Sequence, residues 1–318
     1  MQMDRRMFVA GVAAAACTTP SWALDVGTVP LGLQTYTFHS VRQGGLEAID
    51  TMIDGMRALK VDLCELWAPQ SEPFALPPTY WGAWRQTKDA GTPAAMTPVQ
   101  RDARRNELRA WRMNPPGDYF NRIAQRFSNA RIRLFAYNYS FEPTMTDAEI
   151  EHGFLAAKAM FVSTITASSR PSMALRVKPF AEKHGITVAF HNHSNLKDPD
   201  DVATPESFRK VLAMSPRFKI NLDVAHFAAA GFDSIAFLEE QHANIVNLHV
   251  HDRLANDGKS VPYGQGVAPV QQVLKLVRDR GWKLPCFYEL EYVGGDGRDV
   301  IAETRRELDY EIRALQQK

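Results

Sequence analysis

The sequence predicts an α/β fold, a single (β/α)8 barrel of the TIM type with an insertion after the second strand. From residue 30 onward, apolar strand-like runs alternate about eight times with amphipathic helical segments, a pattern typical of parallel βα units. The 318 residues, 45% of them hydrophobic, are enough for one large barrel domain. Four of the later runs end in His, Asp or Glu, and in this fold the active site lies at the C-terminal ends of the strands.

The predicted strands are apolar runs of strand length. They lie at residues 31–38, 61–67, 132–137, 162–167, 186–191, 218–223, 245–251 and 285–291. The first predicted helix shows the helical spacing of apolar residues, at Leu46, Ile49, Met52, Ile53 and Met56. The predicted helices lie at residues 46–59, 117–127, 147–160, 171–184, 205–214, 233–241, 268–280 and 298–316. We place the barrel domain at residues 28–318.

Residues 68–116 interrupt this alternation. They contain several prolines, and their basic and aromatic residues include Arg101, Arg104, Arg105, Tyr80, Trp81, Trp84 and Trp111. A solvent loop of this length is uncommon inside a compact domain unless it is functional. We therefore predict a loop followed by a helix at 98–112, placed to cover the mouth of the barrel. Its aromatic residues either pack the insertion against the domain or stack on a sugar.

Residues 1–23 are interpreted as an export signal of the twin-arginine type. Arg5-Arg6 precedes a short apolar run from Phe8 to Cys17, and a small-residue cleavage site ends at Ala23. We expect cleavage after Ala23 and delivery to the bacterial periplasm. The apolar run is too short to span a bilayer, so no stable membrane insertion is expected after cleavage. Whether Cys17 is lipidated stays open.

Charge and cysteine content exclude several classes of protein. The formal net charge of +1 provides no attraction to nucleic acid or to an anionic membrane, so a small neutral molecule is the better partner. Cys64 and Cys286 each lie inside an apolar run and are expected to be buried and unpaired, without a disulfide framework. The sequence leaves the oligomeric state open and allows a homo-oligomer.

The candidate site consists of polar side chains at strand ends. Asn247, His249 and His251 share one face of a strand, because successive side chains point to opposite faces. The other members are His191 and His193, Asp223 with His226, and Glu289 with Glu291. A mixed set of carboxylates and imidazoles favours Mn²⁺, Zn²⁺, Co²⁺ or Fe²⁺ over Ca²⁺. Glu65 lies in an apolar run and must find a partner or shift its pKa, which makes it a further candidate.

The chain resembles the xylose-isomerase-like TIM-barrel superfamily of sugar phosphate isomerases and epimerases. The resemblance covers roughly residues 29–315 and rests on five motifs: Cys64-Glu65-Leu66-Trp67, His191-Asn192-His193, Asn221-Leu222-Asp223 with His226, Leu248-His249-Val250 with Asp252, and Glu289-Leu290-Glu291. It implies that Asp223, His249 and Glu289 bind the metal. It also implies that His226 contacts the substrate, and we assign His191, Glu65 and Trp67 to the substrate site as well.

One feature departs from the family pattern. The epimerases carry a metal-binding glutamate on their fourth strand, whereas residues 161–168 of this chain contain no carboxylate. Either His193 or His191 completes the metal site, or an extra water does, and we assign His193 as the fourth ligand. A two-base epimerase mechanism is less favoured, because the remaining carboxylates lie together on one strand.

The predicted function is that of a divalent-metal-dependent sugar isomerase or epimerase acting through an ene-diolate intermediate. The metal would hold a carbonyl oxygen and its neighbouring hydroxyl while a base removes the proton between them. The base is Glu291 or Glu289, whichever is not a ligand, followed by His251. The alternative is a lyase or hydratase that eliminates a β-substituent from 3-keto-glycosides or inosose-like substrates. A non-catalytic periplasmic sugar-binding protein is the third reading.

Overall fold

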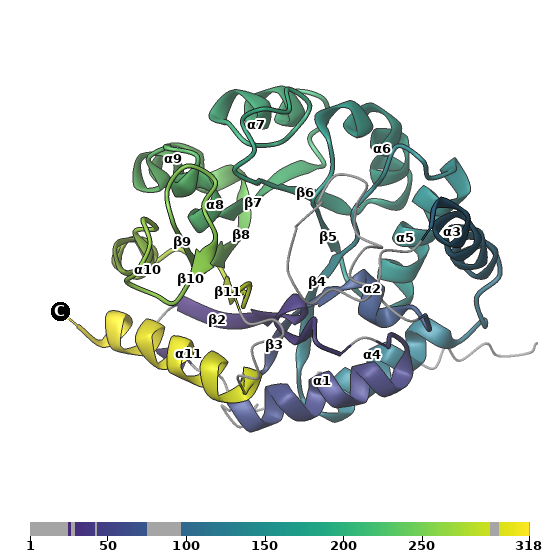
Figure 1. Ribbon diagram of the computed structural model, residues 1–318, viewed down its shortest axis with the longest axis horizontal. Coiled ribbons are helices and arrows are strands. Elements are labelled where there is room, and N and C mark those ends of the chain that lie inside the picture. Colours follow the sequence, from purple (N-terminus) through teal and green to yellow (C-terminus); the bar gives the residue numbers. More distant parts are fainter. Residues whose placement is uncertain (1–24, 27–28, 42, 75–96, 293–298, 318) are drawn as a thin grey trace, which may run out of the picture.

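Eight parallel strands form a closed ring inside a layer of helices (Figure 1). The computed structural model describes residues 25–26, 29–41, 43–74, 97–292 and 299–317. The strand order is β2-β11-β8-β7-β6-β5-β4-β3, and pairing of β2 with β3 closes the ring. The strands are β2 (Val29–Gln34), β3 (Leu63–Trp67), β4 (Arg133–Asn138), β5 (Thr164–Ala167), β6 (Thr187–His191), β7 (Phe218–Asp223), β8 (Ile245–Val250) and β11 (Cys286–Tyr288). The predicted (β/α)8 barrel is confirmed.

Helices cover the outside of the ring. They are α1 (Leu46–Leu59), α2 (Ala68–Ser71), α3 (Pro98–Met113), α4 (Tyr119–Asn129), α5 (Asp147–Ala159), α6 (Pro171–His184), α7 (Pro205–Leu212), α8 (Val224–Ala229), α9 (Ser234–Gln241), α10 (Val270–Asp279) and α11 (Val300–Gln316). Helix α1 has the predicted bounds, and its spaced apolar residues Ile49, Met52 and Met56 are fully buried. Capping boxes at Thr146 and Thr204 fix the starts of α5 and α7 by satisfying their first backbone N–H groups.

Local structure differs from the prediction at several strand ends. The predicted first strand runs too far, because β2 ends at Gln34, whose side chain accepts a hydrogen bond from the backbone of Tyr36 and starts the 3-10 helix Thr35–Phe38. A short strand, β1 (Asp25–Val26), pairs antiparallel with β2. Helix α8 and the hairpin of β9 (Asp252–Arg253) and β10 (Ser260–Val261) were not predicted. A 3-10 turn at His242–Asn244 precedes β8.

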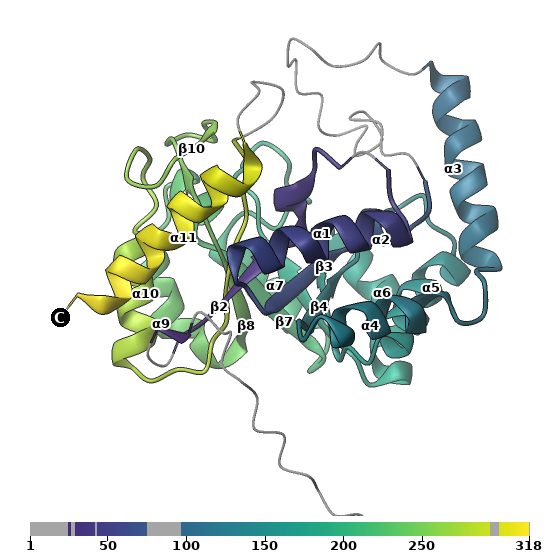
Figure 2. The ribbon, with the colours of Figure 1, turned by 90° about the horizontal axis from the view of Figure 1, so that it is seen from below.

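The insertion contains the predicted helix as α3, which stands beside α5 in Figure 2. Its C-terminal turn is anchored by Arg112, which makes hydrogen bonds of 2.7 and 3.1 Å to the two carboxylate oxygens of Glu72. Trp111 packs edge-on against Tyr119 and Phe120, so this aromatic residue holds the insertion to the domain. Tyr80, Trp81 and Trp84 of the insertion lie outside the described residues, as does the predicted export signal at 1–23 with Cys17.

Both cysteines in the described part of the chain, Cys64 and Cys286, are buried and unpaired, which confirms that prediction. Among the described helices, none is both long enough and apolar enough to cross a membrane.

Candidate active site

Glu65, on β3, lies inside the barrel and is fully buried. Its Oε1 accepts hydrogen bonds from Thr166 Oγ1 at 2.6 Å and Asn138 Nδ2 at 3.1 Å. Its Oε2 accepts a hydrogen bond from Asn247 Nδ2 at 2.9 Å and lies 2.9 Å from His249 Nε2. Because an ionised carboxylate can only accept, His249 donates from Nε2. Glu65 therefore fixes the His249 ring from inside the barrel, and all four contacts are to protein groups.

His249 connects this buried layer to the mouth of the barrel. Its Nδ1 makes no hydrogen bond within the described part of the chain and lies 3.0 Å from Glu289 Oε2. Burial alone would lower the pKa of His249, but the carboxylates of Glu65 and Glu289 on its two sides outweigh burial and raise the pKa well above its usual value. The Nδ1 side of this imidazole is therefore a place where a positive charge, a proton or a metal cation, is stabilised.

Asp223 ends β7 and caps the N-terminus of α8. Its Oδ1 accepts a hydrogen bond of 2.7 Å from the backbone of His226, and its Oδ2 lies 2.9 Å from His251 Nε2. The Asn192 side chain bonds to both the carbonyl and the N–H of Asp223, at 3.1 and 2.9 Å, and so holds its backbone. Burial raises the pKa of Asp223, but His251 and His226 outweigh burial and hold the pKa well below its usual value. The carboxylate is therefore ionised.

Five imidazole rings gather around Asp223. Ring centroids lie 4.8 Å apart for His191 and His249, 5.0 Å apart for His191 and His193, and 5.1 Å apart for His193 and His226. Burial, His249 and His193 lower the pKa of His191 well below its usual value, and burial lowers the pKa of His226 to about 4. His191 and His226 are therefore neutral at pH 7, the form in which imidazole binds metal ions.

Three groups of these side chains place their ligand atoms within 4.8 Å of one another. The groups are His191, His193 and His226; His191, Asp223 and His249; and Asp223, His226 and His251. Two of the residues predicted to bind metal, Asp223 and His249, thus lie together with His191. Glu289 adjoins that group through its contact with His249. His193 lies in a different group and has its Nδ1 3.7 Å from Asp201 Oδ1.

Glu291 is engaged by an arginine that was not assigned to the site from the sequence. Arg253 Nη1 lies 2.6 Å from Glu291 Oε2, and Ser260 Oγ donates to the same oxygen at 2.8 Å. Burial raises the pKa of Glu291, but His251, His226 and Arg253 outweigh burial and hold the pKa well below its usual value. A carboxylate with a lowered pKa is a weak base, so Glu291 is poorly suited to proton abstraction in this arrangement.

Two further site residues, Ser194 and Asp257, belong to no sequence motif. Ser194 Oγ lies 3.0 Å from His226 Nδ1 and donates a short hydrogen bond to Asp257 Oδ1. These two contacts fix the orientation of the His226 imidazole, which the family resemblance assigns to substrate binding. Asp257 lies in the turn between β9 and β10, which explains why periodicity does not reveal it.

An aromatic pair flanks the C-terminal ends of β2 and β3. Tyr36 meets the half-buried Trp67 edge-on, with ring centroids 4.9 Å apart, and stacks on His39 at the same separation. The Thr35 hydroxyl accepts a hydrogen bond of 2.8 Å from the backbone of Trp67 and joins the two strand ends. The predicted substrate residue Trp67 thus lies in an aromatic group suited to contact with the apolar face of a sugar ring.

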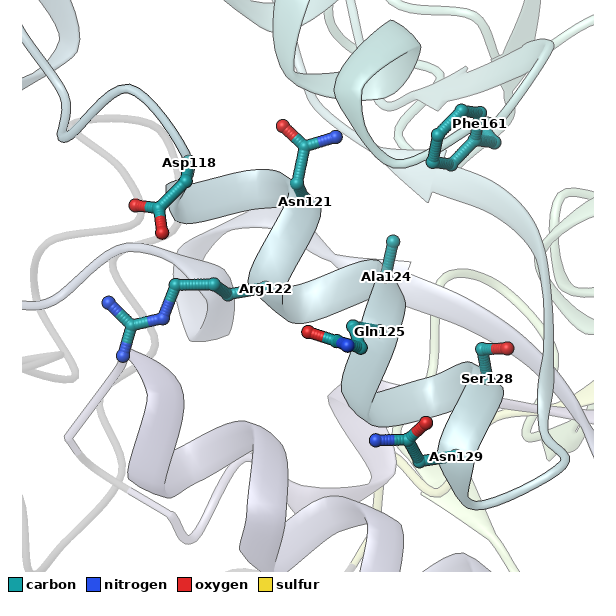
Figure 3. Close-up of a pocket in the computed structure, with 8 residues that line it drawn as sticks. All are labelled: Asp118, Asn121, Arg122, Ala124, Gln125, Ser128, Asn129 and Phe161. Carbon is teal, nitrogen blue, oxygen red and sulfur yellow. The ribbon is translucent and has the colours of Figure 1, made fainter.

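The pocket in Figure 3 lies elsewhere. It is lined by one side of α4, with Asn121 and Gln125 among its residues, and by Phe161, which follows α5. The α5–β5 connection is at the N-terminal end of a strand, the face of a TIM barrel that supports stability rather than catalysis. This pocket is therefore separate from the histidine cluster.

The family model described as xylose isomerase-like TIM barrel matches residues 174–315, the part of the chain that carries all five histidines of the cluster. Over these residues the chain is similar to that family. The probable L-ribulose-5-phosphate 3-epimerase of Mycoplasma pneumoniae is 24% identical over 173 residues, covering 53% of this chain and 48% of that protein. The chain thus aligns with about half the length of this relative.

Two solved structures share the fold across the barrel. The 3-keto-D-glucoside 4-epimerase of E. coli is 10% identical, with a TM-score of 0.58 over 89% of this chain and 98% of that chain. The IOLI protein with a bound zinc atom is 14% identical, with a TM-score of 0.58 over 91% of this chain and 99% of that chain. At these identities the likeness establishes the fold alone.

Proposed function

We propose that this chain is a divalent-metal-dependent enzyme of the sugar isomerase or epimerase type, acting on a sugar or keto-sugar through an ene-diolate. One observation carries the proposal. His249 is held through Nε2 by the buried carboxylate of Glu65, which leaves Nδ1 facing Glu289. A carboxylate that orients a histidine from behind is the arrangement found at metal-ligating histidines.

The residues present fit a divalent metal ion. Asp223, His191 and His249 offer one carboxylate and two imidazoles within 4.8 Å of one another. The Nδ1 atoms of His191 and His249 are buried and make no hydrogen bond among the described residues. This donor set suits Mn²⁺, Zn²⁺, Co²⁺ or Fe²⁺, and Glu289 is placed to add a second carboxylate. The zinc atom in the IOLI structure supports the same choice.

When bound, the metal supplies a Lewis acid that polarises a substrate carbonyl. The protein residues then have separate tasks. Glu289, or His251 if Glu289 is a ligand, accepts the proton from the carbon beside the carbonyl. His226 and the aromatic pair of Trp67 and Tyr36 position the sugar. Bulk water is excluded from the site, because the side chains of His226, His249 and His251 are each 2% exposed or less.

Elimination is the second candidate outcome of the same enolisation. Strand β5 presents Thr166 to the barrel interior, and its hydroxyl is already bonded to Glu65. A second base on the opposite face of a planar intermediate is therefore missing from this strand, and two-base epimerisation is less favoured. A lyase or hydratase acting on 3-keto-glycosides or inosose-like substrates needs one base only, and the likeness to a 3-keto-D-glucoside epimerase supports a keto-sugar substrate.

The test combines metal content with isotope exchange. We expect purified protein to bind a divalent metal, and the Asp223→Ala, His249→Ala double variant to lose it, while His242→Ala, a histidine outside the site, keeps it. Incubation with keto-sugars and 3-keto-glucosides in D₂O should place deuterium beside the carbonyl, and Glu289→Gln should abolish this exchange. Turnover of an identified substrate without breaking that C–H bond would refute enolisation.

We also propose that the chain is exported to the bacterial periplasm by its twin-arginine signal. The support is the paired arginines, Arg5 and Arg6, directly before the apolar run. Replacing both with lysine should leave the precursor in the cytoplasm, and the N-terminus of the exported wild type should begin just after Ala23. Unchanged periplasmic delivery of the lysine variant would contradict the proposal.

A further inference from the structure

The histidine cluster contains donors for two cations rather than one. One half consists of His191, His249 and Asp223, with Glu289 beside His249. The other half consists of His226, His251 and the same Asp223. Glu291 adjoins this second half, with its Oε1 3.8 Å from His226 Nε2 and its Oε2 3.9 Å from His251 Nδ1. Each half therefore has two imidazoles, a glutamate of its own and the shared aspartate, the ligand types of a two-metal centre.

The second half already holds a positive charge. Arg253 Nη1 lies 2.6 Å from Glu291 Oε2, 3.1 Å from Ser260 Oγ and 3.5 Å from His226 Nε2. The Arg253 side chain is 13% exposed, and a guanidinium stays charged throughout the pH range in which proteins fold. A divalent cation bound between Glu291 and His226 would meet this charge at short range, where little water screens the repulsion.

The backbone presents Arg253 to this position from a well-fixed hairpin. Arg253 pairs with Ser260 across β9 and β10. The neighbouring Asp252 side chain accepts hydrogen bonds from the backbone of Gly264, Gly266 and Ala268, at 3.0, 2.8 and 3.0 Å. A guanidinium on a hairpin held in this way cannot leave the site without breaking the contacts around it.

We infer that Arg253 takes the place of a second metal ion, and that it confines the histidine cluster to a single cation. In this role Arg253 is a positioning residue, since it acts by neutralising and orienting Glu291. Glu291 then serves as the anchor of the guanidinium rather than as a base. The inference concerns the second half of the cluster alone and does not depend on the reaction proposed above.

The experiment measures metal stoichiometry instead of activity. Wild type and Arg253→Met, which removes the guanidinium charge but keeps an unbranched apolar stem, are dialysed against Mn²⁺ and analysed for bound metal per chain. We expect the wild type to bind one ion and Arg253→Met to bind two, and the Mn²⁺ electron paramagnetic resonance spectrum of Arg253→Met to show the exchange coupling of a close pair. Arg253→Lys is the matched control and should keep the wild-type count.

Further variants decide the remaining outcomes. Adding Glu291→Gln to Arg253→Met should remove the extra ion, because the second half loses its own carboxylate. If Arg253→Met does not fold, Arg253→Gln removes the same charge and keeps a hydrogen-bond donor for Glu291. An unchanged count in the neutral variants, or two ions already bound to the wild type, would overturn the inference. A wild type that binds one ion and an Arg253→Met variant that also binds one would overturn this inference and leave the proposed function standing, whereas a wild type without metal would refute the metal dependence in the proposed function.

Discussion

Replacing Glu65 with glutamine removes one negative charge from the barrel interior and preserves the shape of the side chain. Four donors face Glu65 at 2.6 to 3.1 Å, and glutamine offers one acceptor oxygen where glutamate offers two. If that oxygen stays with Thr166 and Asn138, the new amide nitrogen faces His249 Nε2. The imidazole then satisfies this donor by moving its own proton to Nδ1, which removes the lone pair that would bind a metal.

The expected loss of metal affinity is about 10- to 100-fold, or about 1.4 to 2.7 kcal/mol, the effect of removing an outer carboxylate from a ligating histidine. If the glutamine amide instead points its oxygen at His249, the hydrogen bond is kept and only the negative charge is lost. In that orientation we expect a loss of metal affinity near the 10-fold end of the range. Competition titration with a metal chelator measures the affinity, and circular dichroism confirms that the variant folds.

Thr166→Val is the matched control for Glu65→Gln. It removes one of the two hydrogen bonds to Oε1 and leaves the contact of Oε2 with His249 intact, so we expect a clearly smaller loss of metal affinity. Wild-type affinity in Glu65→Gln would refute the argument that Glu65 sets the tautomer of His249. Equal losses in the two variants would show that any damage to the buried layer has the same effect.

Three further predictions concern stability. Burial raises the pKa of Glu311 from 4.5 to about 8, so the folded protein binds a proton between these pH values and its free energy of unfolding falls as pH rises through them. At pH 7 this loss of stability is about 3 kcal/mol. In urea titrations, Glu311→Gln should therefore be more stable than wild type at pH 7 and equal to it at pH 4. Arg112→Met leaves the buried Glu72 without its ion-pair partner and should lower the free energy of unfolding by about 3 to 5 kcal/mol in the same assay. The double variant Arg112→Met, Glu72→Gln should recover most of this loss, because it no longer buries an unpaired charge. Gly266→Ala should lower the melting temperature in calorimetry, because the added Cβ would lie 2.2 Å from Asp252 Oδ1. Gly281→Ala is the control: the added Cβ has open space around it, and its φ of 64° should cause only a smaller decrease through backbone strain.

Periodicity was sufficient to predict the barrel and the strand ends that carry the site. The first helix and the seventh predicted strand segment at 245–251 lie where expected to within a residue, because their apolar residues recur at regular spacing. Helix α8 was missed because six residues are fewer than two turns and show no period. Its position nevertheless decides the orientation of His226.

The partners of the site residues could not be predicted from local sequence. Glu65 and His249 are 184 positions apart, and only closure of the ring brings them together. A polar residue in an apolar run signals that a partner exists, but it carries no information on which strand supplies it. Arg253 did have a local signal, since it directly follows the histidine motif, and its significance appears only from its contact with Glu291.

The four donors to Glu65 also bear on how the chain folds. Two of them, Asn138 and Thr166, come from the same half of the barrel as Glu65, and the other two, Asn247 and His249, come from the opposite half. A half-barrel that ended before β8 would bury the carboxylate with only part of its partners, and a buried charge without them is costly. Neither half of the barrel therefore provides all the partners that Glu65 needs. The buried carboxylate favours folding in which the two halves associate and the ring closes together.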